Sequence, residues 1–178
     1  MYGPIVVMGV SGAGKTAVGA ALAARLGAAF KDADDLHPLP NVEKMTAGVP
    51  LTDEDRWPWL RLVGAELAAD HPHGIVVACS ALKRAYRDAI RAAAPSTRFV
   101  LLEVAPSVLK ERLVQRPGHF MPVALLTSQL ETLEALETAE AGMTVTSEGG
   151  IEALTDQILA NLRQVQLAVP TGTDQNER

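Results

Sequence analysis

The sequence predicts an α/β fold in which five strands form a parallel sheet with helices on both of its faces. Short, mostly apolar segments alternate along the chain with longer segments of helical composition. This alternation is typical of parallel sheets, because the connection between two parallel strands must cross the sheet and usually does so as a helix. A length of 178 residues suits one domain. We expect the domain to span residues 1–167, followed by a flexible polar tail over residues 168–178.

The expected strands are the short apolar segments, and the expected helices lie between them. In chain order the strands cover residues 4–8, 29–33, 75–79, 98–104 and, more weakly, 143–146. The first and third of these are apolar throughout, as buried parallel strands are. The helices are expected over residues 16–26, 41–47, 53–69, 82–93, 106–115, 122–139 and 151–165.

The start of the third expected helix carries two conflicting signals. Thr52 and Asp55 have the spacing of a capping box, which predicts a helix that begins between them. Pro58 would remove a helical hydrogen bond if the helix began at Asp53. We therefore expect an irregular start, or a start nearer Trp57.

The first strand leads directly into a glycine-rich loop with the pattern G-x-x-x-x-G-K-T. The loop consists of Gly9, Val10, Ser11, Gly12, Ala13, Gly14, Lys15 and Thr16. Glycine lets backbone N–H groups turn inward around phosphate oxygens, and the following helix points the positive end of its dipole at the same anion. Lys15 can reach the β- and γ-phosphates, and the Thr16 hydroxyl can bind Mg²⁺. The motif therefore predicts a nucleotide-phosphate site, with ATP and Mg²⁺ as its ligands.

Three carboxylates and a histidine follow the second strand, in the segment Asp32-Ala33-Asp34-Asp35-Leu36-His37-Pro38. Ligands of parallel sheets bind at the carboxyl ends of the strands, so this segment is expected to share a cleft with the glycine-rich loop. Asp34 is predicted to orient an acceptor hydroxyl or take its proton, or else to hold Mg²⁺ through water. Asp35 is expected only to cap the following helix. His37 can bind substrate or brace the loop, and the sequence does not decide between these roles.

Two further segments place polar and basic side chains at the expected cleft. Arg56 can bind the carboxylate of an acidic substrate, or it can pair instead with Asp53 or Glu54. Ser80 and Lys83 follow the third strand and are placed to face phosphate or substrate. Both segments are therefore candidates for substrate binding.

Three residues in and after the third strand are not expected to take part in the chemistry. Cys79 is interpreted as a small buried apolar residue rather than a nucleophile, because nothing near it in the sequence would activate a thiol. Arg84 and Arg87 are interpreted as solvated residues on a helix surface.

The basic segment over about residues 112–122 predicts a mobile lid. Arg112 and Arg116 are four residues apart and share a helix face, and Gly118 gives the segment backbone freedom. In small phosphotransferases such a segment closes over ATP and excludes water, which would otherwise accept the phosphoryl group. We expect both arginines to contact ATP and His119 to contact the substrate. A solvated basic helix end is the alternative.

Charge, cysteine content and hydropathy argue against nucleic acid, cysteine-bound zinc and a membrane as partners. The chain has 16 Lys and Arg against 21 Asp and Glu, a net charge of −5, and no basic stripe, so nucleic acid is not an expected partner. One cysteine excludes an internal disulfide and a cysteine-based zinc site. No apolar run is long enough to span a bilayer, and the chain opens without the features of a signal peptide. We therefore expect a cytoplasmic enzyme with no membrane partner.

Several segments, taken in order, are specific enough to compare with a known family. They are residues 8–16, 32–38, 44–45 with 48, 50–56, 58–60, 79–83 with 86–88, 118–121 and 128–134. Together they resemble the gluconate kinase (gluconokinase) family of P-loop small-molecule kinases, over roughly residues 4–162. The glycine-rich loop is shared by many families. The patterns Asp-x-Asp-x-x-His-Pro, Cys-Ser-Ala-Leu-Lys and Gly-His-Phe are far more specific.

The resemblance implies a P-loop kinase fold with a mobile lid, in a homodimer. It also implies ATP-dependent phosphorylation of D-gluconate at its 6-hydroxyl, with Mg²⁺, to give 6-phospho-D-gluconate and ADP. Two positions depart from the family pattern. Ala135 stands where members tend to have proline, and Val145-Thr146-Ser147 replaces a Val-Asp-like pair. These departures concern the adenine side and the local backbone more than the reacting centre.

Two alternative functions are compatible with the glycine-rich loop. One is a kinase for another small hydroxy acid such as shikimate. The other is a nucleotide-gated switch with slow hydrolysis, which would require a guanine-selecting Asn/Thr-Lys-x-Asp motif that the sequence lacks. ADP production that depends on added gluconate would separate the gluconate kinase from both.

Overall fold

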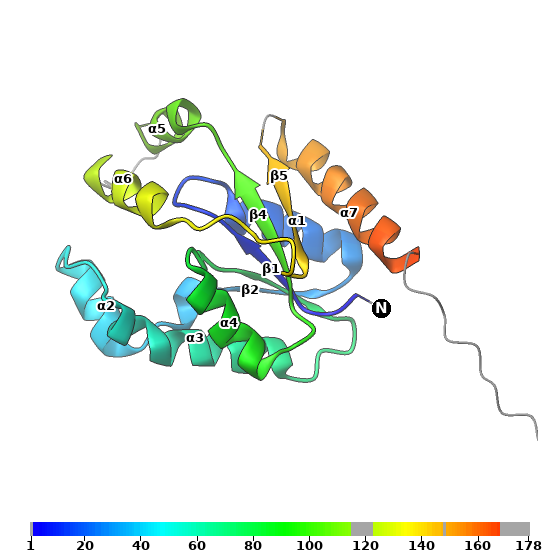
Figure 1. The fold of residues 1–178 in the computed structure, drawn as a ribbon, viewed down its shortest axis with the longest axis horizontal. Coiled ribbons are helices and arrows are strands. Elements are labelled where there is room, and N and C mark those ends of the chain that lie inside the picture. The colour runs from blue at the N-terminus through cyan, green and yellow to red at the C-terminus, as the bar shows by residue number, and fades with distance from the viewer. Residues whose placement is uncertain (1, 115–122, 148, 168–178) are drawn as a thin grey trace, which may run out of the picture.

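Five parallel strands form the centre of the molecule in the order β2-β3-β1-β4-β5 (Figure 1). They are β1 (Ile5–Met8), β2 (Ala29–Asp32), β3 (Ile75–Ala78), β4 (Arg98–Glu103) and β5 (Gly142–Thr146). Every neighbouring pair is parallel, so the predicted five-stranded parallel sheet is confirmed. The computed structural model describes residues 2–114, 123–147 and 149–167, and the statements below concern these residues.

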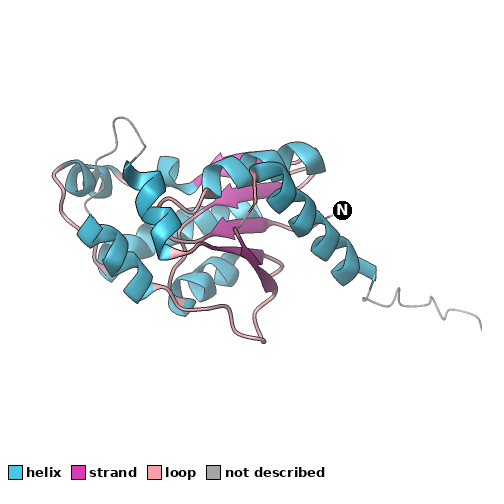
Figure 2. Cartoon of the chain, turned by 90° about the horizontal axis from the view of Figure 1, so that it is seen from above, coloured by secondary structure: helices cyan, strands magenta, loops and turns pink. Residues whose placement is uncertain are grey.

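Helices cover both faces of the sheet, as predicted (Figures 1 and 2). They are α1 (Lys15–Leu26), the short 3₁₀ helix η1 (Ala33–Leu36), α2 (Leu39–Thr46), α3 (Asp53–Ala68), α4 (Arg84–Ala93), α5 (Pro106–Val114), α6 (Val123–Thr132) and α7 (Ile151–Leu167). Helices α1 and α7 pack on one face, and α3 and α4 pack on the other. Among the described helices none is long and apolar enough to cross a bilayer.

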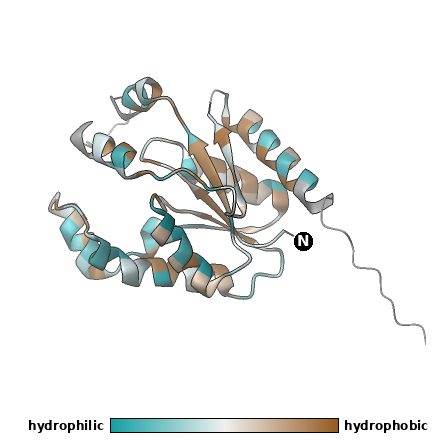
Figure 3. Cartoon of the chain, in the orientation of Figure 1, coloured by the Kyte–Doolittle hydropathy of each residue, from teal (hydrophilic) through white to brown (hydrophobic). Residues whose placement is uncertain are grey.

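The two faces of the sheet explain why the first strand is apolar at every position. Successive side chains of a strand point to opposite faces. Ile5 and Val7 pack into the cluster that contains α1 and α7, whereas Val6 and Met8 pack into the cluster that contains α3 and α4. All four side chains are buried. The apolar colour of the central strands is visible in Figure 3.

The helix predicted over residues 122–139 is shorter than expected, because α6 ends at Thr132. Beyond it, the backbone N–H of Glu134 donates to the carbonyl oxygen of Leu82 at 2.9 Å. The carbonyl oxygens of Glu134 and Ala135 accept hydrogen bonds from Arg87. Backbone groups that would continue the helix are therefore engaged by another part of the fold, which overrides the local helical preference.

The prediction of an irregular or delayed start for α3 is wrong. The helix begins at Asp53, and Thr52 and Asp55 form a complete capping box. Pro58 lies inside the helix with its side chain exposed. The carbonyl oxygen that loses its helical partner belongs to Glu54, which is also exposed, so water can satisfy it.

The cap predicted from Asp35 is also wrong. The side chain of Asp32 caps η1 by accepting from the backbone N–H of Asp34. Helix α2 follows Pro38 without any side-chain cap. Pro40 occupies its first turn, where a missing N–H costs nothing, so fewer donors there require a cap.

Candidate active site

The glycine-rich loop connects β1 to α1 at the carboxyl edge of the sheet. Gly9 has a φ of 143°, and a Cβ atom there would lie 2.9 Å from the carbonyl oxygen of Leu102. Gly14 has a φ of 95° and is the N-cap of α1. Both positions need backbone angles that other residues rarely adopt. Lys15 Nζ donates to the carbonyl oxygen of Val10 at 3.1 Å, which places its ammonium group at the loop.

Two helices distant in sequence also contact this loop. Arg112 of α5 donates from Nη1 to the carbonyl oxygens of Gly12 and Ala13, both at 3.4 Å. Gln129 Oε1 of α6 accepts from the backbone N–H of Ser11 at 2.7 Å. The two helices on either side of the predicted lid are therefore both joined to the phosphate loop.

Most of the predicted lid lies outside the described residues. Of its predicted ATP contacts, Arg112 is described and lies at the loop, consistent with a role near phosphate. Arg116 and His119 fall in the segment 115–122, which the structure does not describe. Their roles therefore stay predictions.

Thr16, Asp32 and Asp34 lie together beside the loop. Thr16 Oγ1 donates to Asp32 Oδ2 at 2.7 Å, and Asp32 Oδ1 accepts from the backbone N–H of Asp34 at 3.1 Å. The side chain of Asp34 opens toward solvent, but the protein around it displaces part of the bulk water. This desolvation, followed by the Asp32 carboxylate, raises the pKa of Asp34 against the opposing effect of Lys15. Thr16 follows Lys15 in the chain and donates to Asp32, so Lys15 and Asp34 lie at the same edge of the sheet.

The oxygen atoms of Thr16 and Asp32 fit a magnesium ion that arrives with a nucleotide. Mg²⁺ prefers oxygen ligands, keeps several waters and often takes only one or two protein oxygens beside substrate phosphates. In the part of the chain that the structure describes, no group of three or more His, Cys, Asp or Glu residues could hold a metal. Two protein oxygens beside phosphate oxygens and water match the way Mg²⁺ is usually bound together with a nucleotide.

His37 follows η1 and stacks on Trp59 of α3, with ring centroids 4.2 Å apart and an angle of 14° between the planes. Trp59 Nε1 donates to the carbonyl oxygen of Ala33 at 2.7 Å. The stack therefore braces the turn that carries Asp34, which is one of the two roles left open by the sequence. Burial, followed by the nearby Arg56, lowers the pKa of His37 to about 4, so the ring is neutral at neutral pH.

A cluster of polar side chains joins the starts of α3 and α4. Lys83 Nζ donates to both carboxylate oxygens of Asp53, at 2.9 and 2.8 Å. The Tyr86 hydroxyl donates to the same carboxylate and accepts from Arg56 Nη1 at 3.3 Å. The hydrogen bonds from Lys83 and then Tyr86 lower the pKa of Asp53. Asp53 is therefore paired with Lys83, and Arg56 is held through Tyr86 rather than in the salt bridge considered as its alternative.

The turn after β3 packs against the phosphate loop. The carbonyl oxygen of Ser80 accepts from the backbone N–H of Gly9 at 3.4 Å, and the Ser80 side chain is half-buried. Cys79 is buried, and burial raises the pKa of its thiol to about 12. The interpretation of Cys79 as a structural residue is therefore supported, since so high a pKa leaves almost no thiolate.

A hollow of about 400 Å³ lies beside the phosphate loop, on the side of α7. Its lining comes from the loop, from α1, from the segment after β5 and from the start of α7, with Arg112 and Ser147 at its border. Arg112 Nη2 lies 3.5 Å from Ser147 Oγ. The hollow adjoins the phosphate loop on the side of β5, away from Asp34, Arg56 and Lys83, so it suits the nucleoside part of a nucleotide.

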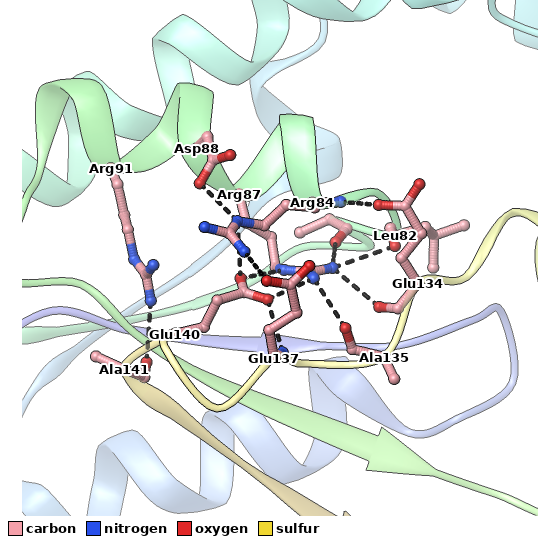
Figure 4. Close-up of polar contacts among 11 residues, drawn as sticks. Leu82, Arg84, Arg87, Asp88, Arg91, Glu134, Ala135, Glu137, Glu140 and Ala141 are labelled. Carbon is pink, nitrogen blue, oxygen red and sulfur yellow. Dashed lines mark hydrogen bonds and ion pairs between the residues drawn. The ribbon is translucent and has the colours of Figure 1, made fainter.

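The interpretation of Arg87 as solvated surface is wrong. Its side chain is completely buried and donates to Glu140 Oε1 and Oε2 at 2.6 and 2.7 Å (Figure 4). The remaining donors reach the carbonyl oxygens of Ala81, Leu82, Glu134 and Ala135. Arg84 is half-buried and binds Asp88 and Glu137, so it is closer to the expected surface residue.

Four contributors to the site were given no role there from the sequence. The sequence placed Asp32 at the cleft with the other carboxylates of its segment but assigned it no role of its own. Arg87, Asn41 and Gln129 carry no local signal, since each acts on a residue or backbone group that only folding brings near. Gln129 and Ser11, for example, are 118 positions apart.

Comparison with known proteins places this arrangement in a family. A family model described as an AAA domain matches residues 5–136. The gluconokinase of Gluconobacter oxydans is 45% identical over 161 residues, covering 89% of this chain and 90% of that protein. The thermosensitive gluconokinase of Escherichia coli is 42% identical, with coverage of 97% and 96%.

Solved structures lead to the same family. The crystal structure of a gluconokinase from Sinorhizobium meliloti superposes with a TM-score of 0.84 at 48% identity, covering 92% of this chain and 93% of that one. Shikimate kinase from Aquifex aeolicus reaches a TM-score of 0.60 at only 17% identity, over 93% and 99% of the two chains, and so shares the fold alone. With a P-loop kinase fold and relatives this similar over nearly its whole length, the chain belongs to the gluconokinase family.

Proposed function

We propose that the protein phosphorylates D-gluconate at its 6-hydroxyl, with ATP as the donor, and releases 6-phospho-D-gluconate and ADP. The observation that carries this proposal is the convergence of Lys15 and Asp34 at one edge of the sheet, with Arg56 and Lys83 on the neighbouring elements. The loop suits a nucleotide phosphate, the carboxylate suits an acceptor hydroxyl, and the cations suit an acid. The similarity to gluconokinases favours gluconate over shikimate.

On the ATP side, the loop amides would hold the β- and γ-phosphates while Lys15 stabilises the transferring phosphoryl group. Lys15 now donates to a carbonyl oxygen, and a charged phosphate oxygen would form a stronger bond with it. Thr16 and Asp32 are the residues that would hold Mg²⁺. When bound, the ion would neutralise charge on the β- and γ-phosphate oxygens.

On the acceptor side, Asp34 would receive the proton of the 6-hydroxyl as the new O–P bond forms, or would orient that hydroxyl in line with the γ-phosphate. Its raised pKa makes the carboxylate a better base than an ordinary aspartate. A water-mediated contact to Mg²⁺ is the alternative role for the same oxygen atoms.

The carboxylate of gluconate would bind near Arg56 and Lys83. The Lys83–Asp53 pair is partly exposed, with side-chain exposures of 32% and 41%, so it can rearrange when another carboxylate arrives. His37 and Ser80 line the adjoining turns and would contact substrate hydroxyls. The loss of kcat/KM for gluconate in Lys83→Met measures how much of that contact Lys83 provides.

The remaining parts of the proposal follow the family. The hollow beside α7 would take the nucleoside of ATP, and Arg112 would reach its phosphates. Arg116 and His119 would act from a lid over about residues 112–122, within a single domain over residues 1–167. We also propose that the protein is a homodimer and lies in the cytoplasm, as expected from the sequence and its family resemblance.

A coupled assay of ADP formation tests the proposed reaction. We expect steady ADP production with ATP, Mg²⁺ and D-gluconate, and only background production with shikimate. A panel of related sugar acids measures how strictly gluconate is preferred. Equal rates with and without gluconate would contradict the proposal, and a higher rate with shikimate would favour the alternative kinase.

The role of Asp34 is tested by Asp34→Asn, with Asp35→Asn as a matched control. The first variant keeps the shape but loses the charge, so kcat should fall by about 10²–10⁴-fold with little change in ATP affinity. The control removes an exposed carboxylate of the same turn and should leave kcat within about twofold of normal. Collapse of ATP affinity with an unchanged gluconate KM would instead assign Asp34 to the metal.

A further inference from the structure

Asn41 of α2 is a buried amide that joins His37 to the start of α3. Its residue is 3% exposed. Its Nδ2 atom donates to the backbone carbonyl oxygen of Asp55 at 2.9 Å and lies 3.3 Å from His37 Nδ1. No role follows for Asn41 from the reaction itself, yet a buried side-chain amide needs partners and this one has found two.

The contact with Asp55 decides which way the amide points. A backbone carbonyl oxygen can only accept a hydrogen bond, so the amide atom that faces Asp55 must be the nitrogen. With the opposite orientation, two oxygen atoms would face each other inside the protein, which is unfavourable. The second hydrogen of the same nitrogen is then directed at His37.

The orientation of Asn41 in turn decides the tautomer of His37. An amide nitrogen donates, so His37 Nδ1 must accept and cannot carry a proton. The ring is neutral, because burial and Arg56 lower its pKa. Its single N–H is therefore at Nε2. Stacking on Trp59 holds the plane of the ring in place.

We propose that Asn41 is a positioning residue that holds His37 in the Nε2–H tautomer, so that His37 offers a fixed donor to an oxygen of the acidic sugar substrate. Among the described residues, Nε2 of His37 has no hydrogen-bond partner of its own. A polyhydroxylated acid presents many acceptor oxygens, and the other tautomer would turn a lone pair toward them. The identity of the substrate rests on the proposed function, but the tautomer does not.

The tautomer can be measured on the free protein by ¹⁵N NMR of the histidine side chains. The chain has four histidines, and loss of one set of signals in His37→Gln assigns those of His37. We expect Nδ1 of His37 to have the chemical shift of an unprotonated ring nitrogen and Nε2 that of a protonated one. A protonated Nδ1, or a mixture of tautomers in the wild-type protein, would overturn the proposal without any variant of Asn41.

Two variants of Asn41 then test the cause. Asn41→Asp replaces the donor by an acceptor, so the proton of His37 should move to Nδ1. Asn41→Leu removes the donor and should produce a mixture of tautomers. The signals of His71, which binds Glu66 elsewhere, should not change in either variant. An unchanged His37 tautomer in a folded Asn41 variant would mean that Asn41 does not control it.

A double-mutant cycle separates positioning from a general structural role. Asn41→Leu should raise the gluconate KM by about twofold, because only part of the protein then carries the donor tautomer, and leave the ATP KM unchanged. His37→Gln keeps an amide donor near the place of Nε2 that needs no tautomer control. In that background Asn41→Leu should leave the gluconate KM unchanged. Equal losses in both backgrounds would show that Asn41 acts only through the fold.

Failure of this inference and failure of the proposed function give different results. If the wild-type protein does not phosphorylate gluconate but His37 has its proton at Nε2, the proposed function fails and the tautomer stands. If gluconate is phosphorylated but His37 does not carry its proton at Nε2, only the proposed role of Asn41 fails.

Discussion

Two cations one helical turn apart on α4 have opposite surroundings. Arg87 is wholly buried against Glu140, whereas Lys83 at the N-cap of α4 is partly exposed and pairs with Asp53. Every nitrogen of the Arg87 guanidinium donates to an oxygen of the protein (Figure 4). Lys83 binds a single carboxylate that solvent also reaches. Arg87 therefore stabilises the fold, whereas Lys83 can exchange Asp53 for another carboxylate.

The buried cation joins two segments that are distant in the sequence. Arg87 donates to the carbonyl oxygens of Ala81 and Leu82 after β3, and to those of Glu134 and Ala135 after α6. Ala81 has a φ of 41°, a left-handed conformation that costs a residue with a Cβ about 1–2 kcal/mol. The ion pair therefore stabilises a strained turn whose next residues carry Lys83 to the cleft.

The comparison teaches that residue type and position on one helix do not reveal the task of a cation. Burial and the number of accepting oxygens do. A buried charge that loses its partner remains unpaired, while an exposed one is solvated by water.

The largest effect is expected from Glu140→Gln. The variant leaves Arg87 buried with a neutral partner and should lower the free energy of unfolding by about 3–5 kcal/mol, measured by urea denaturation. Glu137→Gln is the matched control on the same loop. Its side chain is 62% exposed, so the loss should stay below about 1 kcal/mol. Similar losses in the two variants would erase the contrast between buried and exposed pairs.

Lys83→Met should do the reverse, with a small effect on stability and a large one on catalysis. The aliphatic stem is kept, but the positive charge at the cleft is lost, so kcat/KM for gluconate should fall by about 10- to 100-fold. Arg84→Met removes the next cation of α4, which faces Asp88 and Glu137 instead. That control should leave kcat/KM near normal. If Lys83→Met unfolds the protein and Arg84→Met does not, Lys83 belongs with Arg87 as a structural cation.

A smaller effect is expected at Gln129, which joins helix α6 to the phosphate loop. Gln129→Leu removes the acceptor for the Ser11 N–H, so the phosphate loop should lose part of its shape. We expect the ATP KM to rise by about fivefold, the effect of one neutral hydrogen bond, with the gluconate KM unchanged. Gln157→Leu, at an exposed glutamine of α7, is the control. A change confined to gluconate would show that α6 serves the acceptor side.

The smallest effect is the expected change with pH in how much Glu140 stabilises the fold. Burial alone would raise the pKa of Glu140, but the hydrogen bonds from Arg87 and the Glu137 backbone outweigh it, so the net pKa lies below its ordinary value of 4.5. A carboxyl group with a lowered pKa stabilises the fold above its unfolded pKa, and this stability is lost as pH falls through the folded pKa. The difference in unfolding free energy between wild type and Glu140→Gln should be constant above about pH 5.5 and shrink below pH 4.5. A difference that grows in acid would reverse the assigned sign.

Local patterns in the sequence were sufficient for the fold class, the five strands and the phosphate loop. Apolar strands, helical segments and a glycine motif depend on residues close together in the chain, so their signals survive without a structure. The same holds for the clustering of Asp34 and Lys83 at strand ends, because parallel topology brings those ends to one edge. The roles of the individual site residues remain predictions for the experiments above.

Tertiary structure alone decided how α6 ends, where Arg87 lies and which partners Asn41 and Gln129 bind. Arg87 and Glu140 are 53 positions apart, so no local pattern distinguishes Arg87 from the half-buried Arg84 three residues before it. Helix α3 begins regularly at Asp53 despite Pro58. The carbonyl oxygen of Glu54, which loses its helical partner, belongs to an exposed residue and can bind water. In each case the outcome depended on whether a polar group met another polar group or solvent, and that is settled only when distant segments pack.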